Sequence, residues 1–485
     1  MKQENTQYFL NTAMKGGVIV AVTIFLQVII GFVTQVALTR MLSPEIFGQV
    51  VFAASVAMFF NAFSNLRGDV YVIHHKGSAK DAVDVAFTLE LLMALFFVTI
   101  VFFIAPTMMS LLDKSEQTIY VQILAIAFLY NPLSRPRCIL ERELSFFQSK
   151  FPTILSQVFA SIISISLAFN GYGVWSLLCW RLLPLFGEVL ILWIITPYRP
   201  KLRLDNKHAV SMMYLTWPLV GSAILAFVCY NIDYFIVGQF LEDGIKQLGY
   251  YWLGFQAAAY ALMARQVLHE VLFPIFSRME NDKFKGQAFL RFSKAVAGVF
   301  LILTILAVSF GRDIIIYIYG MQWEPAIFPF QVIFIVVLMR AIIANIGYYL
   351  YSSGNTRTDF VSALLSSILL IPSVYFGVIY FGINGAAVAV LVVQIIVSSI
   401  IYEWYIRPMV GYGVFYFLFW PLVISGLTFA LAYISDSLQL SIFIRLALVS
   451  ILFIMTYFSV LRSVLSDLKL AFNLLRSQQK NQLST

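Results

Sequence analysis

The chain has 485 residues, of which 61% are hydrophobic and only 12% are charged. A soluble protein carries about 25% charged residues, so this composition excludes a soluble globular protein and indicates a membrane protein. The formal net charge is +8. We assign this charge to membrane topology and anionic lipid head groups rather than to nucleic acid, because no basic stripe extends into a soluble domain.

Apolar windows long enough to cross a bilayer recur along the whole chain. Prolines and polar residues interrupt two of them, at 119–139 and 173–196. The pattern predicts an all-α polytopic membrane protein with fourteen helices, at about 16–38, 46–66, 83–105, 119–139, 152–169, 173–196, 211–239, 247–274, 296–319, 325–352, 359–381, 384–405, 412–435 and 440–461.

Lysine and arginine are distributed unevenly between the two sides of the predicted membrane. With a cytoplasmic N-terminus, 24 of the 32 lysines and arginines fall in cytoplasmic segments and 5 on the opposite side. Cytoplasmic loops carry an excess of these residues, so we expect both termini to be cytoplasmic. The remaining three, Arg181, Arg265 and Arg340, fall within predicted spans.

Two hairpins six helices apart have a similar pattern. The segments "TRMLSPEIFGQVVFAASVAMF" (39–59) and "GQFLEDGIKQLGYYWLGFQAAAY" (238–260) each carry an acidic turn, then a glycine after an apolar residue, Gly48 and Gly249. An even offset preserves orientation, which predicts a parallel repeat. We expect two six-helix lobes at 1–200 and 201–406, a helix pair at 407–462 and a cytoplasmic amphipathic tail at 463–485.

Seven segments in a fixed order resemble one family of transporters. They are "RMLSPEIFGQV" (40–50), "RPRCILERELSFFQSK" (135–150), "FNGYGVWSLLCWRL" (169–182), "NIDYFIVGQFL" (231–241) with its continuation to 262, "VLFPIFSRMENDK" (271–283), and "YLYSSGNTRTDF" (349–360) followed by "YFGINGAAVAVLV" (380–392). This set is similar to the polysaccharide-transporter flippases of the Wzx-type, colanic-acid-exporter-like branch. That branch lies within the multidrug/oligosaccharidyl-lipid/polysaccharide exporter superfamily.

The resemblance implies two lobes around a cavity lined mainly by the first, second, seventh and eighth helices. It implies transfer of an undecaprenyl-pyrophosphate-linked oligosaccharide from the inner to the outer leaflet of a bacterial inner membrane. The expected mechanism is alternating access. Expected partners are the lipid-linked substrate and the polysaccharide polymerase or export machinery.

Arg265 is the first candidate for contact with such a substrate. An arginine keeps its charge in a protein, and a charge at mid-membrane costs about 2.5–3.5 kcal/mol on insertion scales. A diphosphate suits bidentate contacts from a guanidinium group. We therefore expect Arg265 to bind the head group; a structural pair with Glu270 or Asp233 is the alternative.

Three further residues are candidates for the substrate path. Arg67, at the cytoplasmic end of the second helix, either receives the head group or anchors the helix at the interface. Gln27, in the first helix, offers hydrogen bonds to sugar hydroxyls or to a neighbouring helix. Arg340, in the tenth helix, either contacts substrate or joins a polar network inside one lobe.

Coupling and gating are assigned to four polar residues. Asp233, with Asn231 beside it, is an intramembrane carboxylate suited to proton or sodium coupling, or to a structural pair. Arg40 is either part of an outer gate with Glu45 or a snorkelling arginine at the interface, and Asp69 accompanies Arg67 on the inner side. We expect no other cofactor and no metal, because the three cysteines and the pair His74-His75 lack a metal-binding spacing.

Two other functions remain as alternatives. A cation-coupled multidrug or metabolite exporter of the same superfamily would need acidic residues in its cavity, whereas the intramembrane charges here are mostly basic. A membrane polymerase or ligase would need an ordered outer loop with catalytic residues, and the predicted outer loops are short. We therefore expect a transporter and not an enzyme.

Overall fold

The computed structural model describes the backbone of residues 2–75, 78–143, 145–277, 282–352, 357–411, 413–438, 442–456 and 458. Side chains are described for most of these residues, with the main exceptions of 2–18, 262–277, 282–292, 342–352, 357–359 and 414–418. The described residues form helices and turns and contain no strand. This confirms the predicted all-α class.

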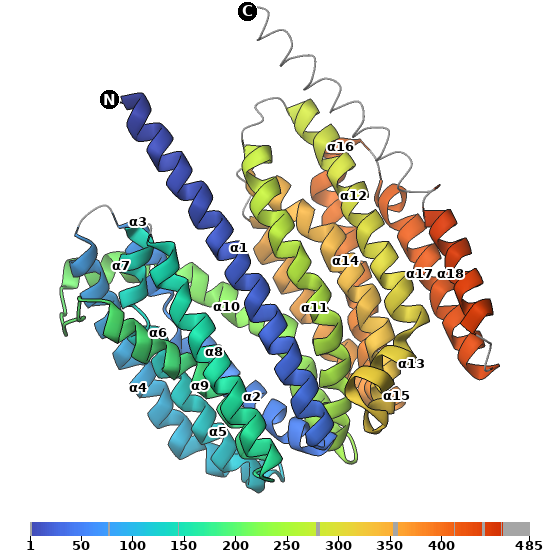
Figure 1. Ribbon diagram of the computed structural model, residues 1–485, viewed down its shortest axis with the longest axis horizontal. Helices are drawn as coiled ribbons and strands as arrows, with labels where there is room; N and C mark the ends of the chain where they lie inside the picture. Colours follow the sequence, from blue (N-terminus) through green and yellow to red (C-terminus); the bar gives the residue numbers. More distant parts are fainter. Residues whose placement is uncertain are drawn as a thin grey trace, which may run out of the picture. The chain divides into compact units, whose positions relative to one another are not determined.

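The chain divides into two compact units, Met1–Trp252 and Leu253–Thr485. The first unit ends within α11, and Figure 1 shows its helices from dark blue to green. In chain order these elements are α1 (Lys2–Met41), α2 (Pro44–Ser64), α3 (Gly68–His74), α4 (Ala79–Leu111), η1 (Ser115–Gln117), α5 (Thr118–Ala125), η2 (Ile126–Leu129), α6 (Tyr130–Leu133), α7 (Pro136–Arg142), α8 (Phe146–Phe169), α9 (Val174–Ile195), α10 (Asn206–Phe240) and α11 (Gly244–Ser277).

The second unit continues α11 and adds the remaining helices. Within it α12 packs against α14, α17 and α18, so the last two helices belong to this unit (Figure 1). The elements are α12 (Asp282–Ser309), α13 (Gly311–Ile314), η3 (Ile315–Tyr319), η4 (Met321–Ala326), α14 (Ile327–Ser352), α15 (Arg357–Ile401), η5 (Tyr402–Ile406), α16 (Arg407–Val410), α17 (Val414–Ser437) and α18 (Ile442–Thr456).

Many of these helices can cross a membrane. Among the described residues, eight helices are long and apolar enough, and a pair bent by 74°, Val296–Ser309 with Gly311–Tyr319, makes a possible ninth. Two shorter apolar helices, Phe419–Ser435 and Ile444–Thr456, follow near the end of the described chain. These helices show that the chain is a polytopic membrane protein.

Two details differ from the predicted spans. The span expected at 119–139 is built from α5, η2, α6 and α7 in series, because Pro132 and Pro136 lack the N–H that continues an α-helix. The spans expected at 359–381 and 384–405 are both present and join at Gly382. This glycine breaks α15 with φ 61° and ψ −145°, a conformation that a residue without a Cβ adopts easily.

Helix α10 belongs to the first unit. Its Met212 and Val220 pack into a buried cluster with Leu66 of the α2–α3 turn and Tyr71 of α3. The predicted boundary at residue 201 assigns this helix to the second lobe. The assignment of helices to two repeated lobes stays a prediction, and the tail at 463–485 lies outside the described residues.

The two glycines of the predicted repeat meet in space. Gly48 of α2 lies against the backbone of Ile245, and Gly249 of α11 lies against the backbone of Pro44. A Cβ at either glycine would collide with the carbonyl group opposite. The first turns of α2 and α11 therefore cross at backbone contact, as small residues allow in membrane proteins.

The turns of the first unit gather at two faces. The turns at 42–43, 112–114, 170–173 and 241–243 form the predicted outer face, where Gln239 donates to the Leu112 carbonyl at 3.3 Å. The turns near 65–67, 134–145 and 196–205 form the predicted inner face, where Arg142 donates to the Val72 carbonyl at 3.3 Å. These two terms are used below in this sense.

Candidate functional site

The predicted inner face of the first unit carries a cluster of four charged residues, Arg67, Asp69, Glu90 and Arg135. The Glu90 carboxylate is buried; it pairs with the Arg135 guanidinium at 2.6 Å and accepts the Gly68 backbone N–H at 2.7 Å. Arg135 also lies 3.7 Å from Asp69, which lies 3.5 Å from Arg67. The cluster joins three segments that are distant in sequence.

This cluster holds Arg67 in an unusual backbone conformation. Arg67 has φ 54° and ψ 41°, a left-handed region that residues with a Cβ occupy at a cost. Its N–H is satisfied by the Asn65 side chain at 3.0 Å, and the following N–H is bound by Glu90. The Arg67 side chain remains 43% exposed, so the turn presents a positive charge at the predicted inner face.

The structure thus brings Arg67 and Asp69 together as the sequence suggested, and it adds Arg135. Neither Glu90 nor its partner Arg135 is among the site residues predicted from the sequence. A signal was present in "RPR" (135–137), where arginines follow a proline-interrupted helix. Each of these arginines takes a buried carboxylate: Arg135 pairs with Glu90, and Arg137 pairs with Glu188 of α9.

The segment 196–205, which joins α9 to α10, is tied along α4. Asp84 of α4 accepts the Tyr198 hydroxyl and the Lys201 backbone N–H, the latter at 2.8 Å. Burial and the Asp84 carboxylate raise the pKa of Tyr198, so its hydroxyl stays a donor. The Arg203 guanidinium pairs with Asp81. These bonds fix a basic, extended segment of the chain at the predicted inner face.

Asp233 lies in the outer half of α10 and is buried. Its carboxylate accepts the Tyr251 hydroxyl of α11 at 2.8 Å and the Tyr234 backbone N–H at 3.0 Å. The rings of Tyr234 and Tyr251 pack edge to face, 5.9 Å apart. Asn231, one half-turn earlier, donates to the Phe227 carbonyl at 3.4 Å. The Asp233 carboxylate is therefore hydrogen-bonded to residues of its own unit.

Replacing Tyr251 with phenylalanine is expected to lower the free energy of unfolding by about 1–3 kcal/mol, because it leaves a buried carboxylate oxygen without this donor. Thermal unfolding of the detergent-solubilised chain measures the change. Tyr214→Phe is the matched control, since Tyr214 is 87% exposed. Equal midpoints for the two variants would contradict the importance of the Asp233 contact.

Gln27 lies where α1 packs on α8. Its backbone carbonyl accepts the Gln157 side-chain amide at 3.2 Å, and Gly31 leaves room for the same amide. Thr23 and Thr34, on the same face, are buried and bond to carbonyls of their own helix. This arrangement favours the helix–helix alternative for this face, and sugar binding by Gln27 stays a prediction.

Arg340 is part of a network in the second unit. It donates to the Gln394 side chain of α15 at 3.2 Å, and its guanidinium carbon lies 5.7 Å from the centre of the Phe255 ring. Gln394 in turn donates to Ser398 at 3.0 Å. The side chain is half-buried. These contacts match the lobe-internal alternative, while a role in substrate binding stays a prediction.

The remaining two predicted residues are Arg40 and Arg265. Arg40 is exposed in the last turn of α1, at the predicted outer face. The backbone of Arg265 lies in α11, but its side chain lies outside the described residues. The gate role of Arg40 and the head-group role of Arg265 therefore both remain predictions. Within the described part of the chain, no group of three His, Cys, Asp or Glu residues is placed to hold a metal ion.

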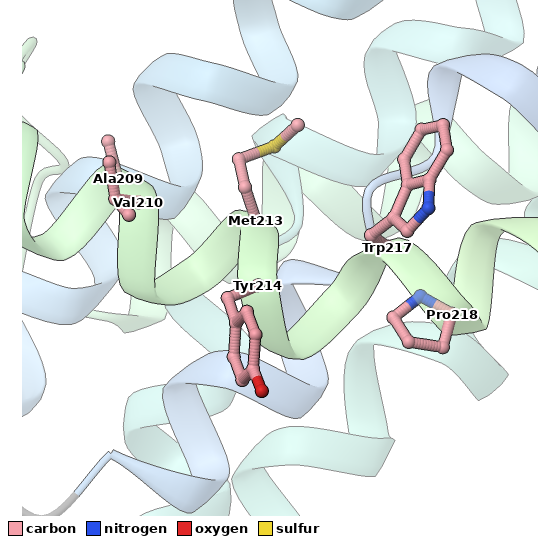
Figure 2. Close-up of a pocket in the computed structure, with 6 residues that line it drawn as sticks. All are labelled: Ala209, Val210, Met213, Tyr214, Trp217 and Pro218. Carbon is pink, nitrogen blue, oxygen red and sulfur yellow. The ribbon is translucent and has the colours of Figure 1, made fainter.

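An apolar cavity of about 740 Å³ lies along the first half of α10. It is lined by Ala209, Val210, Met213, Tyr214, Trp217 and Pro218, and Figure 2 shows their side chains along the helix. Tyr214 and Trp217 are largely exposed. Tyrosine and tryptophan with this exposure near a helix end are typical of the membrane interface. The lining suits hydrocarbon chains rather than sugar or phosphate.

Comparison with known proteins gives a consistent set of relatives. The succinoglycan biosynthesis transport protein ExoT of Rhizobium meliloti (strain 1021) is 23% identical over 79% of this chain and 75% of its own length. The lipopolysaccharide biosynthesis protein WzxC of Escherichia coli (strain K12) is 22% identical over 79% of this chain and 78% of its own. These matches confirm the resemblance drawn from the sequence segments.

Solved structures share the fold. The lipid II flippase MurJ in an inward closed conformation matches with a TM-score of 0.69 and 15% identity, over 92% of this chain and 99% of that chain. An inward-facing multidrug resistance transporter of the MATE family matches with a TM-score of 0.56 and 12% identity, over 79% and 95%. At these identities the likeness shows the fold alone.

The family model described as polysaccharide biosynthesis protein matches residues 37–328, which is more than half of the chain. It includes the charged cluster of the predicted inner face, α9, α10 and the start of α14. The chain therefore belongs to the polysaccharide biosynthesis protein family.

Proposed function

We propose that the chain transfers an oligosaccharide linked to undecaprenyl diphosphate from the inner to the outer leaflet of a bacterial cytoplasmic membrane. The observation that carries this proposal is the family match, joined to relatives named for succinoglycan transport and lipopolysaccharide biosynthesis. The MurJ-like fold supports it, because that protein is named as a lipid II flippase.

The charges of the chain suit an anionic lipid. A diphosphate head group at the inner leaflet would first meet the Arg67 turn, which is held open by the pair of Glu90 and Arg135. Guanidinium groups bind phosphate oxygens in pairs. Arg265, deeper in α11, is the proposed next ligand, and the polyprenyl chain stays among apolar surfaces such as the α10 cavity.

We assign the energy source to an ion gradient acting on Asp233. A carboxylate buried in a span is suited to proton or sodium coupling. Two of its donors are the Tyr251 hydroxyl and the Tyr234 backbone N–H, which hold the carboxylate in place within the span. The exporter of cationic drugs is the weaker candidate, since the MATE likeness concerns the fold alone.

We propose that the chain moves its substrate without making or breaking covalent bonds. On the predicted outer face the described turns of the first unit contain two to four residues. A polymerase or ligase would place its catalytic groups on a longer ordered loop. The proposed orientation, with both termini in the cytoplasm, follows from the lysine and arginine distribution. The polymerase and export machinery are proposed to take over the glycan on the outer side.

Deleting the gene in its host is expected to cause completed lipid-linked repeat units to accumulate on the cytoplasmic face of the membrane. Mass spectrometry of the extracted lipid fraction measures their amount. Lectin labelling of intact inverted vesicles, which expose the cytoplasmic face, measures their side. A plasmid copy of the wild-type gene is the control and should clear them. Unpolymerised units displayed outside the cell would instead indicate a polymerase.

A further inference from the structure

Arg181 carries a positive charge inside an apolar helix of the first unit. The helix α9 (Val174–Ile195) is one of the candidate membrane spans. Arg181 follows its first residue by seven positions, about 10 Å at 1.5 Å per residue. On the predicted topology this depth lies in the outer half of the membrane. A charge at such a position persists when it serves a partner or a water-filled space.

Arg181 differs from the other arginines whose side chains the structure describes. Each of those has a partner: a carboxylate for Arg67, Arg135, Arg137, Arg203, Arg312, Arg407 and Arg445, a carbonyl or amide oxygen for Arg142, Arg199 and Arg340, and a further contact for Arg40. For Arg181, the described residues provide neither a hydrogen bond nor an ion pair.

The nearest carboxylate on its own helix is already occupied. Glu188, two turns along α9, is buried and pairs with Arg137; the Tyr130 hydroxyl lies 3.3 Å away. Glu188 is therefore engaged by Arg137 rather than by Arg181. A structural ion pair, the ordinary reason for an arginine in a span, is absent among the described residues around Arg181.

The Arg181 side chain is partly exposed, and its charge interacts with Tyr234 of α10. The side chain is half-buried, and its nitrogens are not among the buried, unbonded polar atoms of the described chain. It lies within electrostatic reach of the Tyr234 ring. Arg181 therefore lies near the part of α10 that carries Asp233, and a lipid-facing arginine reaching for the interface does not explain that neighbour.

We propose that Arg181 is an anion-binding residue of the substrate path in the outer half of the first unit, with the Tyr234 hydroxyl as a second donor. This rests on the proposed function. The ligand chemistry is a group of anionic oxygens, and two parts of the substrate can supply it: the diphosphate of the lipid and a carboxylate of an acidic sugar. A guanidinium without a protein carboxylate offers all its donors to either group.

The placement gives Arg181 a role distinct from that of the inner-face cluster. Arg67 and Arg135 already interact with Asp69 and Glu90, so an incoming anion competes there with fixed carboxylates. No such competitor is bound to Arg181 among the described residues. An anion that leaves the inner face therefore finds a stronger site in the outer half, which draws it along the path.

The test measures binding to the full chain in lipid nanodiscs. The probes are farnesyl diphosphate with farnesol as its uncharged match, and a glucuronate-bearing tetrasaccharide with its neutral match. Arg181→Met is expected to weaken one charged probe by about tenfold or more, the effect of losing one charge-assisted contact. Loss confined to farnesyl diphosphate assigns the phosphate, and loss confined to the acidic glycan assigns the carboxylate. Arg181→Lys should fall between Arg181→Met and wild type.

Two controls separate binding from folding and from general charge. Arg407→Met removes one positive charge from an exposed i,i+4 pair and should leave both affinities unchanged. Without probe, Arg181→Met should unfold at the wild-type temperature or above, because no contact is lost. Unchanged affinities, or a midpoint as low as that of Arg135→Met, would overturn the inference while leaving the proposed function intact. Wild-type protein that binds neither charged probe would overturn both.

Discussion

Replacing Arg135 with methionine is expected to lower the free energy of unfolding by about 3–5 kcal/mol, because the buried Glu90 carboxylate loses its cation. The loss also frees the Gly68 turn that Glu90 binds, so the conformation of Arg67 should become less defined. Thermal unfolding followed by size-exclusion chromatography in detergent measures the first effect. Export of glycan in the deletion strain measures the second.

The double variant Arg135→Met with Glu90→Gln separates a broken pair from a simple loss of packing. Glutamine keeps an acceptor for the Gly68 N–H but carries no charge, so the double variant should recover part of the stability that Arg135→Met loses. The matched control is Lys150→Met, which breaks the more exposed pair with Glu141 and should cost less than about 1 kcal/mol. Equal losses for Arg135→Met and Lys150→Met would contradict the role of burial.

Replacing Gly48 or Gly249 with alanine is expected to prevent α2 and α11 from crossing at their present distance. Each new Cβ would meet a backbone carbonyl, of Ile245 or Pro44, which cannot turn aside as a side chain can. Overpacking in a tight core typically costs about 1–3 kcal/mol, and valine at either position should cost more than alanine. The yield of folded protein in the membrane and its unfolding temperature measure this effect.

Gly221→Ala is the matched control for these variants. Gly221 also lies inside a membrane helix, α10, but a Cβ there meets nothing within 4 Å. Alanine at that position should leave stability unchanged or raise it by about 0.5–1 kcal/mol, because glycine loses more freedom in a helix. A loss at Gly221 as large as at Gly48 would mean that glycine itself, and not the backbone crossing, is needed.

The positions of the helices follow from hydropathy because each apolar run is a local property. The runs at 152–169 and 211–239 fall inside α8 and α10. The interrupted run at 119–139 does not predict one straight helix, since prolines break the backbone ladder there. The glycines of the repeat, Gly48 and Gly249, were visible in the sequence, but their contact with each other's helix depends on the tertiary arrangement.

The candidate site was predictable only where its parts are neighbours in sequence. Arg67 and Asp69 form a pair that "NLRGDV" already places together. The partner of Glu90 lies on another helix, and no periodicity links it to Arg135. The same limit applies to Glu188 of α9, which pairs with Arg137 of α7. Spacing along one helix identifies a shared face but not which neighbouring segment fills it.

Helix α10 is fastened near both of its ends, and one of its faces is open between them. Asp205 caps its start at 3.0 Å from the Lys207 N–H, and Asp233 joins its outer part to Tyr251. In between, Pro218 cannot bond to the carbonyl one turn back, and Gly221 has open space beside it. Bending of this helix is thus easiest around residues 218–221, where the curvature of its axis can change while both ends stay held.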